Sequence, residues 1–232
     1  MQPTYLPWIG YLAMIDRVDQ FVFLDSVPFN SRSWQQRNYI RSGDEKRLLT
    51  VPVSTKGLSG QLIRDVDIVS DAGFPAKHIR SIEMNYSTCP FFSEYSEGLF
   101  ECYFHSEGKL NRLNQSIILW FCKVLNIETP ICTSSELNSS GSKADLLAGI
   151  CDELGADQYL SAPGSKSYIE ESLAFVRRGI SVEYHEYEHP EYAQFGKGFI
   201  PYIASIDLLF NVGADEALRI IRSGVSEFFE GH

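Results

Sequence analysis

Three features are scarce or absent in this sequence: long apolar runs, paired cysteines and an excess of positive charge. No apolar run approaches the roughly 20 residues that span a bilayer, and no secretory leader is visible. Five cysteines without CxxC spacing argue against a disulfide framework and indicate a reducing compartment. The formal net charge of -10 disfavours a broad electrostatic surface for nucleic acid. We therefore expect a cytoplasmic protein that neither crosses a membrane nor binds nucleic acid.

The composition is that of an ordinary globular chain. Its 232 residues, 44% of them hydrophobic and 22% charged, are enough to bury one substantial core. From Pro130 onward, segments of strand and helix character alternate, which predicts parallel strands joined by right-handed crossovers. We predict a single α/β domain over residues 1–232, with a predominantly parallel sheet and flanking helices. Residues 44–126 are expected to form an inserted or covering subregion, β-rich at first and then helical.

Hydrophobic periodicity places the individual elements. Apolar or alternating runs predict strands over residues 21–24, 48–53, 63–69, 131–134, 158–161 and 180–184. Apolar stripes predict helices over residues 9–17, 77–86, 91–104, 110–124 and 203–211. Ser142 and Ser167 precede acidic residues by three positions and are expected to open two further helices as capping boxes, the second closed by Gly179.

The N-terminal run Gln2 to Tyr11 has the composition of a ligand-facing turn. Two prolines fix the backbone and remove donors, so the run suits neither a helix interior nor a central strand. Tyr5 and Trp8 supply flat faces with polar edges, and Gln2 adds an amide. We predict that these three residues contact a substrate. A proline-rich surface loop is the alternative.

This opening run resembles the signature of the WbqC-like family, bacterial proteins often encoded among surface-polysaccharide genes. The resemblance continues through residues 21–25, 33–38, 159–168 and 187–213, and thus covers nearly the whole chain. It implies a role in O-antigen assembly and a transfer of an aminoacyl or acyl group to an amino sugar. A small molecule, such as a nucleotide-linked amino sugar, is the implied partner, and no cofactor is identified.

The start of the chain departs from that family. Members usually carry a short β-strand just before the signature and often have His where Met1 stands. We expect either that upstream residues are omitted or that the start lies late. Without that strand the sheet would lack a central member.

Polar segments follow the predicted parallel strands, so residues 2–8, 25–38 and 161–168 are expected at one carboxyl edge, where open α/β sheets bind ligands. In the third segment a turn leads into a helix, and Lys166 accompanies it as a predicted catalytic residue. Its amides and hydroxyls would form an anion cradle, although the spacing is not that of a Walker A loop. The predicted contacts there are Ser161, Gly164, Ser165 and Tyr168. An ordinary capped turn is the alternative, and the first and third segments are expected to border one pocket.

The second segment holds Asp25 at a strand end and Trp34, Arg37 and Asn38 further on. Trp34 would stack on a sugar or base, and the donors of Arg37 and Asn38 suit phosphate or carboxylate. Asp25 is predicted to orient a hydroxyl or an imidazole.

His189 lies in a Tyr- and Glu-rich run and is predicted to be the general base, with Tyr192 and Gln194 beside it. His185 precedes it by four residues, yet Pro190 disfavours the helix that metal ligation at that spacing needs, so no metal site is predicted. Asp207 lies in an apolar helix and needs a partner, either a structural one or the site.

Two other functions compete with acyl transfer. Trp8-Ile9-Gly10-Tyr11 stands where nucleotidyl transferases and adenylating ligases of the HIGH-motif superfamily carry His-x-Gly-His, although both histidines are replaced here. A non-catalytic protein that binds sugar nucleotides would need only aromatic and Arg side chains. Convergence of His189, Lys166 and Asp25 would favour catalysis.

Overall fold

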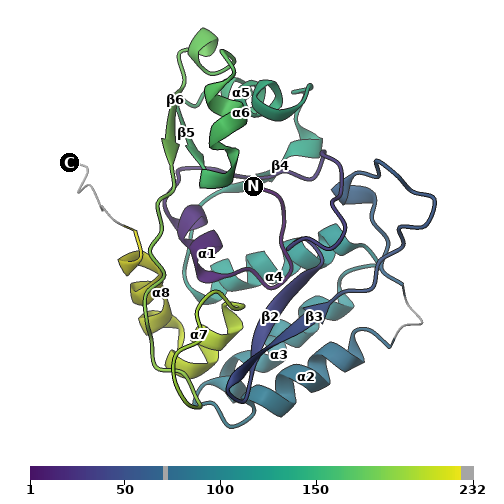
Figure 1. Ribbon diagram of the computed structural model, residues 1–232, viewed down its shortest axis with the longest axis vertical. Coiled ribbons are helices and arrows are strands. Elements are labelled where there is room, and N and C mark those ends of the chain that lie inside the picture. Colours follow the sequence, from purple (N-terminus) through teal and green to yellow (C-terminus); the bar gives the residue numbers. More distant parts are fainter. Residues whose placement is uncertain (70–72, 226–232) are drawn as a thin grey trace.

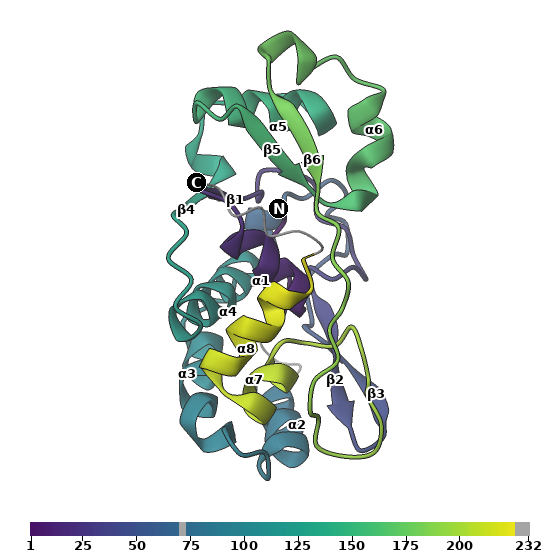
Figure 2. The ribbon, with the colours of Figure 1, turned by 90° about the vertical axis from the view of Figure 1, so that its left-hand side faces the viewer.

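The computed structural model describes residues 1–69 and 73–225. Figures 1 and 2 show an elongated molecule in which β5, β6, α5 and α6 form one end. The helices α2, α3, α7 and α8 and the hairpin β2–β3 form the other end, with α1, β1 and β4 between the two. None of the described helices is long and apolar enough to cross a membrane.

Two pairs of short parallel strands bear out the prediction from strand–helix alternation. β1 (Phe21–Phe23) pairs with β4 (Ile131–Thr133), and β5 (Gln158–Ser161) pairs with β6 (Ser181–Tyr184). The four strands do not form one continuous sheet: the described strands make three separate two-stranded sheets. The fold is thus mixed helix and strand with short parallel sheets.

A cleft of about 380 Å³ lies between β1 and β5, where a continuous sheet would pair them. Both strands line the cleft, together with apolar side chains of α1 (Ile9–Asp16) and α5 (Lys143–Glu153). Met1 extends the ladder of β1: its amino group donates to the Val22 carbonyl, and the Leu24 amide donates to the Met1 carbonyl, each at 2.8 Å. This is the pattern of parallel pairing. The cleft therefore lies where a strand leading into Met1 would run.

The third sheet is the antiparallel hairpin of β2 (Arg37–Ser42) and β3 (Glu45–Thr50). Of these two strands only the second was predicted, as a strand over residues 48–53. The strand predicted over residues 63–69 is wrong at its start, where η1 (Ile63–Asp65) is a 3-10 turn. Ile63 and Val66 are both fully buried, and this spacing of three suits a turn rather than a strand.

The main core lies under the predicted helical stripes. α2 (Ala76–Tyr86), α3 (Phe92–Phe104) and α4 (Leu110–Val124) bury their apolar faces against α1, α7 (Ile206–Val212) and α8 (Ala214–Ser223). The remaining helical pieces are short: η3 (Ser134–Glu136), η4 (Pro163–Ser165), α6 (Lys166–Glu170) and η5 (Val176–Arg178). A second, smaller cluster fills the end formed by α5, α6, β5 and β6.

The helix predicted to begin after Ser142 is confirmed, but neither predicted capping box forms. Ser142 precedes α5, but its side chain forms no cap hydrogen bond. Ser167 lies inside α6, which begins at Lys166 and ends at Glu170, well before Gly179. Gly179 instead ends η5 in the left-handed conformation that glycine favours, with φ of 68°.

Candidate functional site

The structure gathers aromatic rings around His189, in the segment that runs from the end of β6 towards α7. Trp8, the residue just before α1, lies next to three of these rings. Its centroid is 5.4 Å from Tyr187, 6.2 Å from His189 and 5.7 Å from Tyr202. The Trp8 ring also covers Gly10, where an added Cβ would lie 2.3 Å from the ring. Glycine is therefore required at position 10 for this arrangement.

His189 is half-buried, and its hydrogen bonding fixes the tautomer. Nδ1 lies 2.9 Å from the carbonyl oxygen of Pro190. A carbonyl only accepts, so Nδ1 carries the hydrogen and Nε2 keeps a lone pair. Burial lowers the pKa of His189 below its ordinary value, the Pro190 carbonyl opposes this shift, and the charge of Lys46 lowers the pKa further. His189 is thus a neutral imidazole at neutral pH, the protonation state of a general base.

Tyr202 is held in a strained conformation beside this imidazole. Its φ is 56°, in the left-handed region that few non-glycine residues adopt. Its side chain is nevertheless 55% exposed, and its ring centroid is 4.9 Å from that of His189. Strain of this kind costs about 1–3 kcal/mol and concentrates at functional sites.

Tyr192 and Phe199 lie on further sides of His189, at centroid distances of 6.3 Å and 5.7 Å. The Tyr192 hydroxyl donates to Oδ2 of Asp207 at 2.9 Å. Asp207 is fully buried, and burial raises the pKa of its carboxyl. The partner that its position required is thus Tyr192, which makes Asp207 an anchor for this segment.

Arg41 of β2 is a second anchor of the same segment, buried to all but 4% of its surface. Its guanidinium donates to the carbonyls of Lys197 at 2.8 Å and Gly198 at 3.0 Å, and to the Gln194 side chain at 2.7 Å. An added Cβ at Gly196 would lie 2.5 Å from Arg41 Nη2, so only glycine fits there. Gln194, predicted as a substrate contact, is therefore occupied by Arg41 and by the backbone of Ile200.

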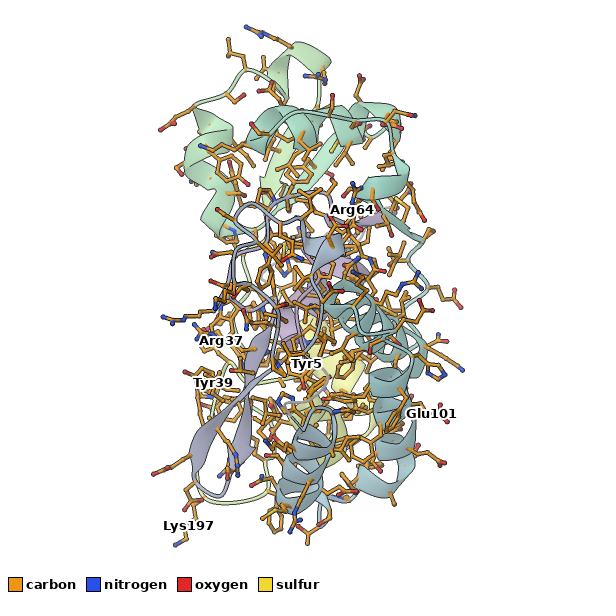
Figure 3. All side chains as sticks on the ribbon, turned by 90° about the vertical axis from the view of Figure 1, so that its right-hand side faces the viewer. Tyr5, Arg37, Tyr39, Arg64, Glu101 and Lys197 are labelled. Atoms are coloured by element: carbon orange, nitrogen blue, oxygen red, sulfur yellow. The ribbon has the colours of Figure 1, made fainter. Side chains whose placement is uncertain are left out.

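Of the residues predicted on the second segment, Trp34 and Arg37 reach the surface. Trp34 is 54% exposed and Arg37 half-exposed, and Figure 3 shows Arg37 and Tyr39 beside β2 at the side of the molecule. Asn38 is buried, and its amide donates to the Leu6 carbonyl at 2.6 Å. Its hydrogen bonding is structural.

Asp25 is buried and saturated by neighbours at the carboxyl ends of β1 and β4. Its carboxylate accepts from the side chain of Asn111, the hydroxyl of Ser134, and both the amide and the hydroxyl of Ser135, at 3.0–3.2 Å. These donors leave Asp25 to hold the two strand ends together. The carboxylate does not orient His189.

Tyr5 and Gln2 likewise have partners inside the protein. The fully buried Tyr5 hydroxyl lies 2.7 Å from Nδ1 of His78 and 2.6 Å from the Tyr103 hydroxyl, and Figure 3 shows Tyr5 in the interior. Gln2 is exposed, and its amide oxygen accepts from Gln35 at 2.7 Å. Tyr5 therefore cannot stack on a ligand without a rearrangement of the core.

The predicted anion cradle lies at the end of β5. The hydroxyls of Ser161 and Ser165 bond to each other, and Gly164 faces open space. Lys166 pairs with Glu170 at 3.7 Å, and its Nζ lies 5.4 Å from the centre of the Tyr184 ring. Tyr168 packs on the smaller core. Across residues 1–69 and 73–225, no hydrogen bond, ion pair or ring contact joins any two of His189, Asp25 and Lys166.

The structure therefore brings His189, Trp8 and Tyr192 together and leaves Asp25 and Lys166 with other partners. The sequence places Arg41 and Lys46 in a basic cluster of ligand or surface charges, but it did not predict that Arg41 anchors this segment or that Tyr202 lies beside His189. A single polar residue in a short strand, or a tyrosine after a proline, gives no local signal of such a role. In the described part of the chain no three His, Cys, Asp or Glu side chains are grouped so as to hold a metal ion.

Comparison with known proteins agrees with the resemblance in the opening run. The model of the WbqC-like protein family matches residues 2–219. The chain is similar to the uncharacterized protein Rv1507c of Mycobacterium tuberculosis, with 33% identity over 217 residues that cover 93% of each chain. No solved structure matches.

Proposed function

The chain belongs to the WbqC-like protein family, and from this premise we propose that it is an enzyme of bacterial surface-polysaccharide assembly that transfers an acyl or aminoacyl group to an amino sugar. One observation carries the proposal: His189 donates through Nδ1 to Pro190, so Nε2 is the basic nitrogen within a cluster of aromatic rings. Exposed aromatic faces suit the apolar face of a sugar ring. The strained, exposed Tyr202 is best placed to provide one.

In the proposed reaction the sugar amine attacks the carbonyl carbon of an activated acyl donor, an ester or thioester. A C–N bond forms, and the bond from the carbonyl carbon to the oxygen or sulfur of the carrier breaks. Nε2 of His189 takes the proton that the amine loses and returns it to the leaving group, which departs with the electron pair. General base catalysis of this kind contributes about 10²–10⁴-fold to the rate.

The test is an assay of the purified protein with a panel of acyl and aminoacyl donors and nucleotide-linked amino sugars, read by the mass of the product. We expect His189→Ala to lower turnover by about 10²–10⁴-fold. His105→Ala, at an exposed histidine after α3, is the matched control and should leave turnover unchanged. Equal turnover of wild type and His189→Ala would refute the role of His189.

The pH dependence gives a second readout. Burial lowers the pKa of His189. The rate should therefore rise with pH as His189 loses its proton, with a midpoint below the ordinary histidine pKa of about 6.5. A rate that rises only above pH 7 would assign the proton transfer to another group.

A nucleotidyl transferase is less well supported. Trp8 packs against aromatic rings, and the buried Tyr11 donates its hydroxyl to the Gln2 carbonyl at 3.1 Å. Neither supplies an imidazole to a phosphate. Ligand binding without turnover on any donor would instead support a non-catalytic sugar-binding protein.

A further inference from the structure

The outer face of the β2–β3 hairpin has an unusual combination of exposed aromatic rings and unpaired cations. Residues directly opposite each other in an antiparallel pair share a face, so Tyr39 and Leu48 lie on the same side of the hairpin as Arg37. The Trp34 ring packs beside Tyr39, with centroids 6.0 Å apart. Trp34 is 54% and Leu48 39% exposed. Large aromatic surface in contact with water is costly unless a ligand covers it.

Two cations flank these rings. Lys46 belongs to the same face, and its Nζ lies 6.0 Å from the centre of the Tyr39 ring. Neither Lys46 nor Arg37 forms an ion pair with any residue that the structure describes, although the chain carries a formal net charge of -10. The third cation of the face, Arg41, is covered by the segment around Gly196 and is satisfied by it. Two positive charges therefore remain for an anion.

This face is continuous with the aromatic cluster around His189. The Tyr39 carbonyl accepts from the Ala204 amide at 2.8 Å, and Ala204 is bridged in turn to Trp8. The charge of Lys46 reaches His189, whose pKa it helps to lower. The hairpin and the His189 cluster are therefore neighbours in the fold.

We propose that the outer face of the β2–β3 hairpin binds a nucleoside diphosphate, with the base stacked on Trp34 and the phosphates held between Arg37 and Lys46. The inference rests on the proposed function and deepens it, since it makes the acceptor a sugar linked to a nucleoside diphosphate. The planar base matches the exposed ring, and the diphosphate matches two cations that have no counter-charge. The sugar end then points to His189.

The experiment measures binding of UDP, CDP, ADP and GDP by calorimetry and by quenching of tryptophan fluorescence, with uridine and inorganic pyrophosphate as partial probes. We expect at least one diphosphate to bind and Trp34→Ala to weaken it by about 10-fold or more. Lys46→Ala should weaken the diphosphate and leave uridine unchanged. Lys123→Ala, at an exposed lysine of α4, is the matched control and should bind as wild type does.

Trp34, Lys46 and Lys123 are at the surface, and an unchanged melting temperature confirms that each variant is folded. No binding of any diphosphate, or equal binding by wild type and Trp34→Ala, would overturn the inference. The outcome is independent of catalysis, because His189→Ala should bind the diphosphate with unchanged affinity. Diphosphate binding without acyl transfer would sink only the proposed reaction. Transfer to a free amino sugar, with no effect of added diphosphate, would sink only the hairpin site.

Discussion

Replacement of Asp25 by alanine tests whether this buried carboxylate holds β1 and β4 together. The change leaves four donors without an acceptor: the Asn111 amide, the Ser134 hydroxyl, and the amide and hydroxyl of Ser135. The two hydroxyls can turn to other acceptors, whereas the backbone amide of Ser135 and the side chain of Asn111 cannot turn as freely. At about 1–3 kcal/mol for each buried unsatisfied donor, the free energy of unfolding should fall by about 2–6 kcal/mol.

The measurement is urea denaturation at pH 7, followed by circular dichroism. Asp25→Asn keeps one oxygen but turns an NH₂ group towards the Asn111 amide or the Ser135 hydroxyl, so its loss should be about 1–3 kcal/mol. Asp19→Asn, at an exposed carboxylate, is the control and should stay within about 0.5 kcal/mol of wild type. A loss below 1 kcal/mol in Asp25→Ala, together with lost activity, would show that Asp25 serves the site and not the fold.

Three further predictions concern pH, the cleft and the segment around His189. Burial lowers the pKa of His78 to about 4, so as the pH falls His78 is protonated in the unfolded chain before it is protonated in the folded one. The free energy of unfolding should therefore be highest above about pH 6.5 and fall by up to about 3 kcal/mol towards pH 4. Urea denaturation at pH 7 and pH 4.5 should show this loss, reduced in His78→Gln; equal pH profiles would contradict it. A five-residue Val/Ile extension before Met1 should raise the melting temperature, because the added strand would fill the cleft beside β1. It would also replace the buried Met1 amino group, whose pKa burial lowers to about 5, with a neutral amide. A Gly/Ser extension of the same length is the control, and equal melting temperatures would argue against strand insertion. Gly196→Ala should displace Arg41 and the loop that Arg41 holds, so the fold-decrease in kcat should exceed the fold-increase in the Kd for nucleotide. Gly57→Ala is the control, because Gly57 also has a positive φ but faces open space. An unchanged kcat would remove Arg41 from the support of the site.

Many of the helices and strands could be predicted because the residues that each element buries are close together in the sequence and form a local apolar pattern. The stripes of α2, α3 and α4 and the apolar runs of β1, β4, β5 and β6 give local signals, and the structure has these elements. β2 escaped prediction because its polar residues are satisfied by distant groups. Asn38 reaches the Leu6 carbonyl, and Arg41 reaches carbonyls near residue 198. Such long-range hydrogen bonds leave no periodic pattern.

The candidate site could be predicted only in part, because local patterns in the sequence do not show long-range contacts. Strand ends indicate an edge, and residues after them are reasonable candidates, but the pattern does not say which side chains meet. Asp25 follows a strand as predicted, yet the serines after β4 satisfy it. His189 meets Trp8 across some 180 residues, beside the bridge that joins Ala204 to Trp8. The partner of each polar group is decided by tertiary packing.

The separation of β1 from β5 has a consequence for how stability is distributed along the chain. The larger core and the smaller cluster around Phe175 are distinct, and no backbone hydrogen bond among the described residues connects β1 to β5. Cooperative units in proteins are those that share a core and a hydrogen-bonded ladder. The amides of β5, β6 and α5 should therefore exchange with solvent deuterium through a partial opening of lower free energy than global unfolding. The amides of α4 should exchange only when the whole molecule unfolds. The chain would then behave in exchange as two foldons, with the boundary at the cleft.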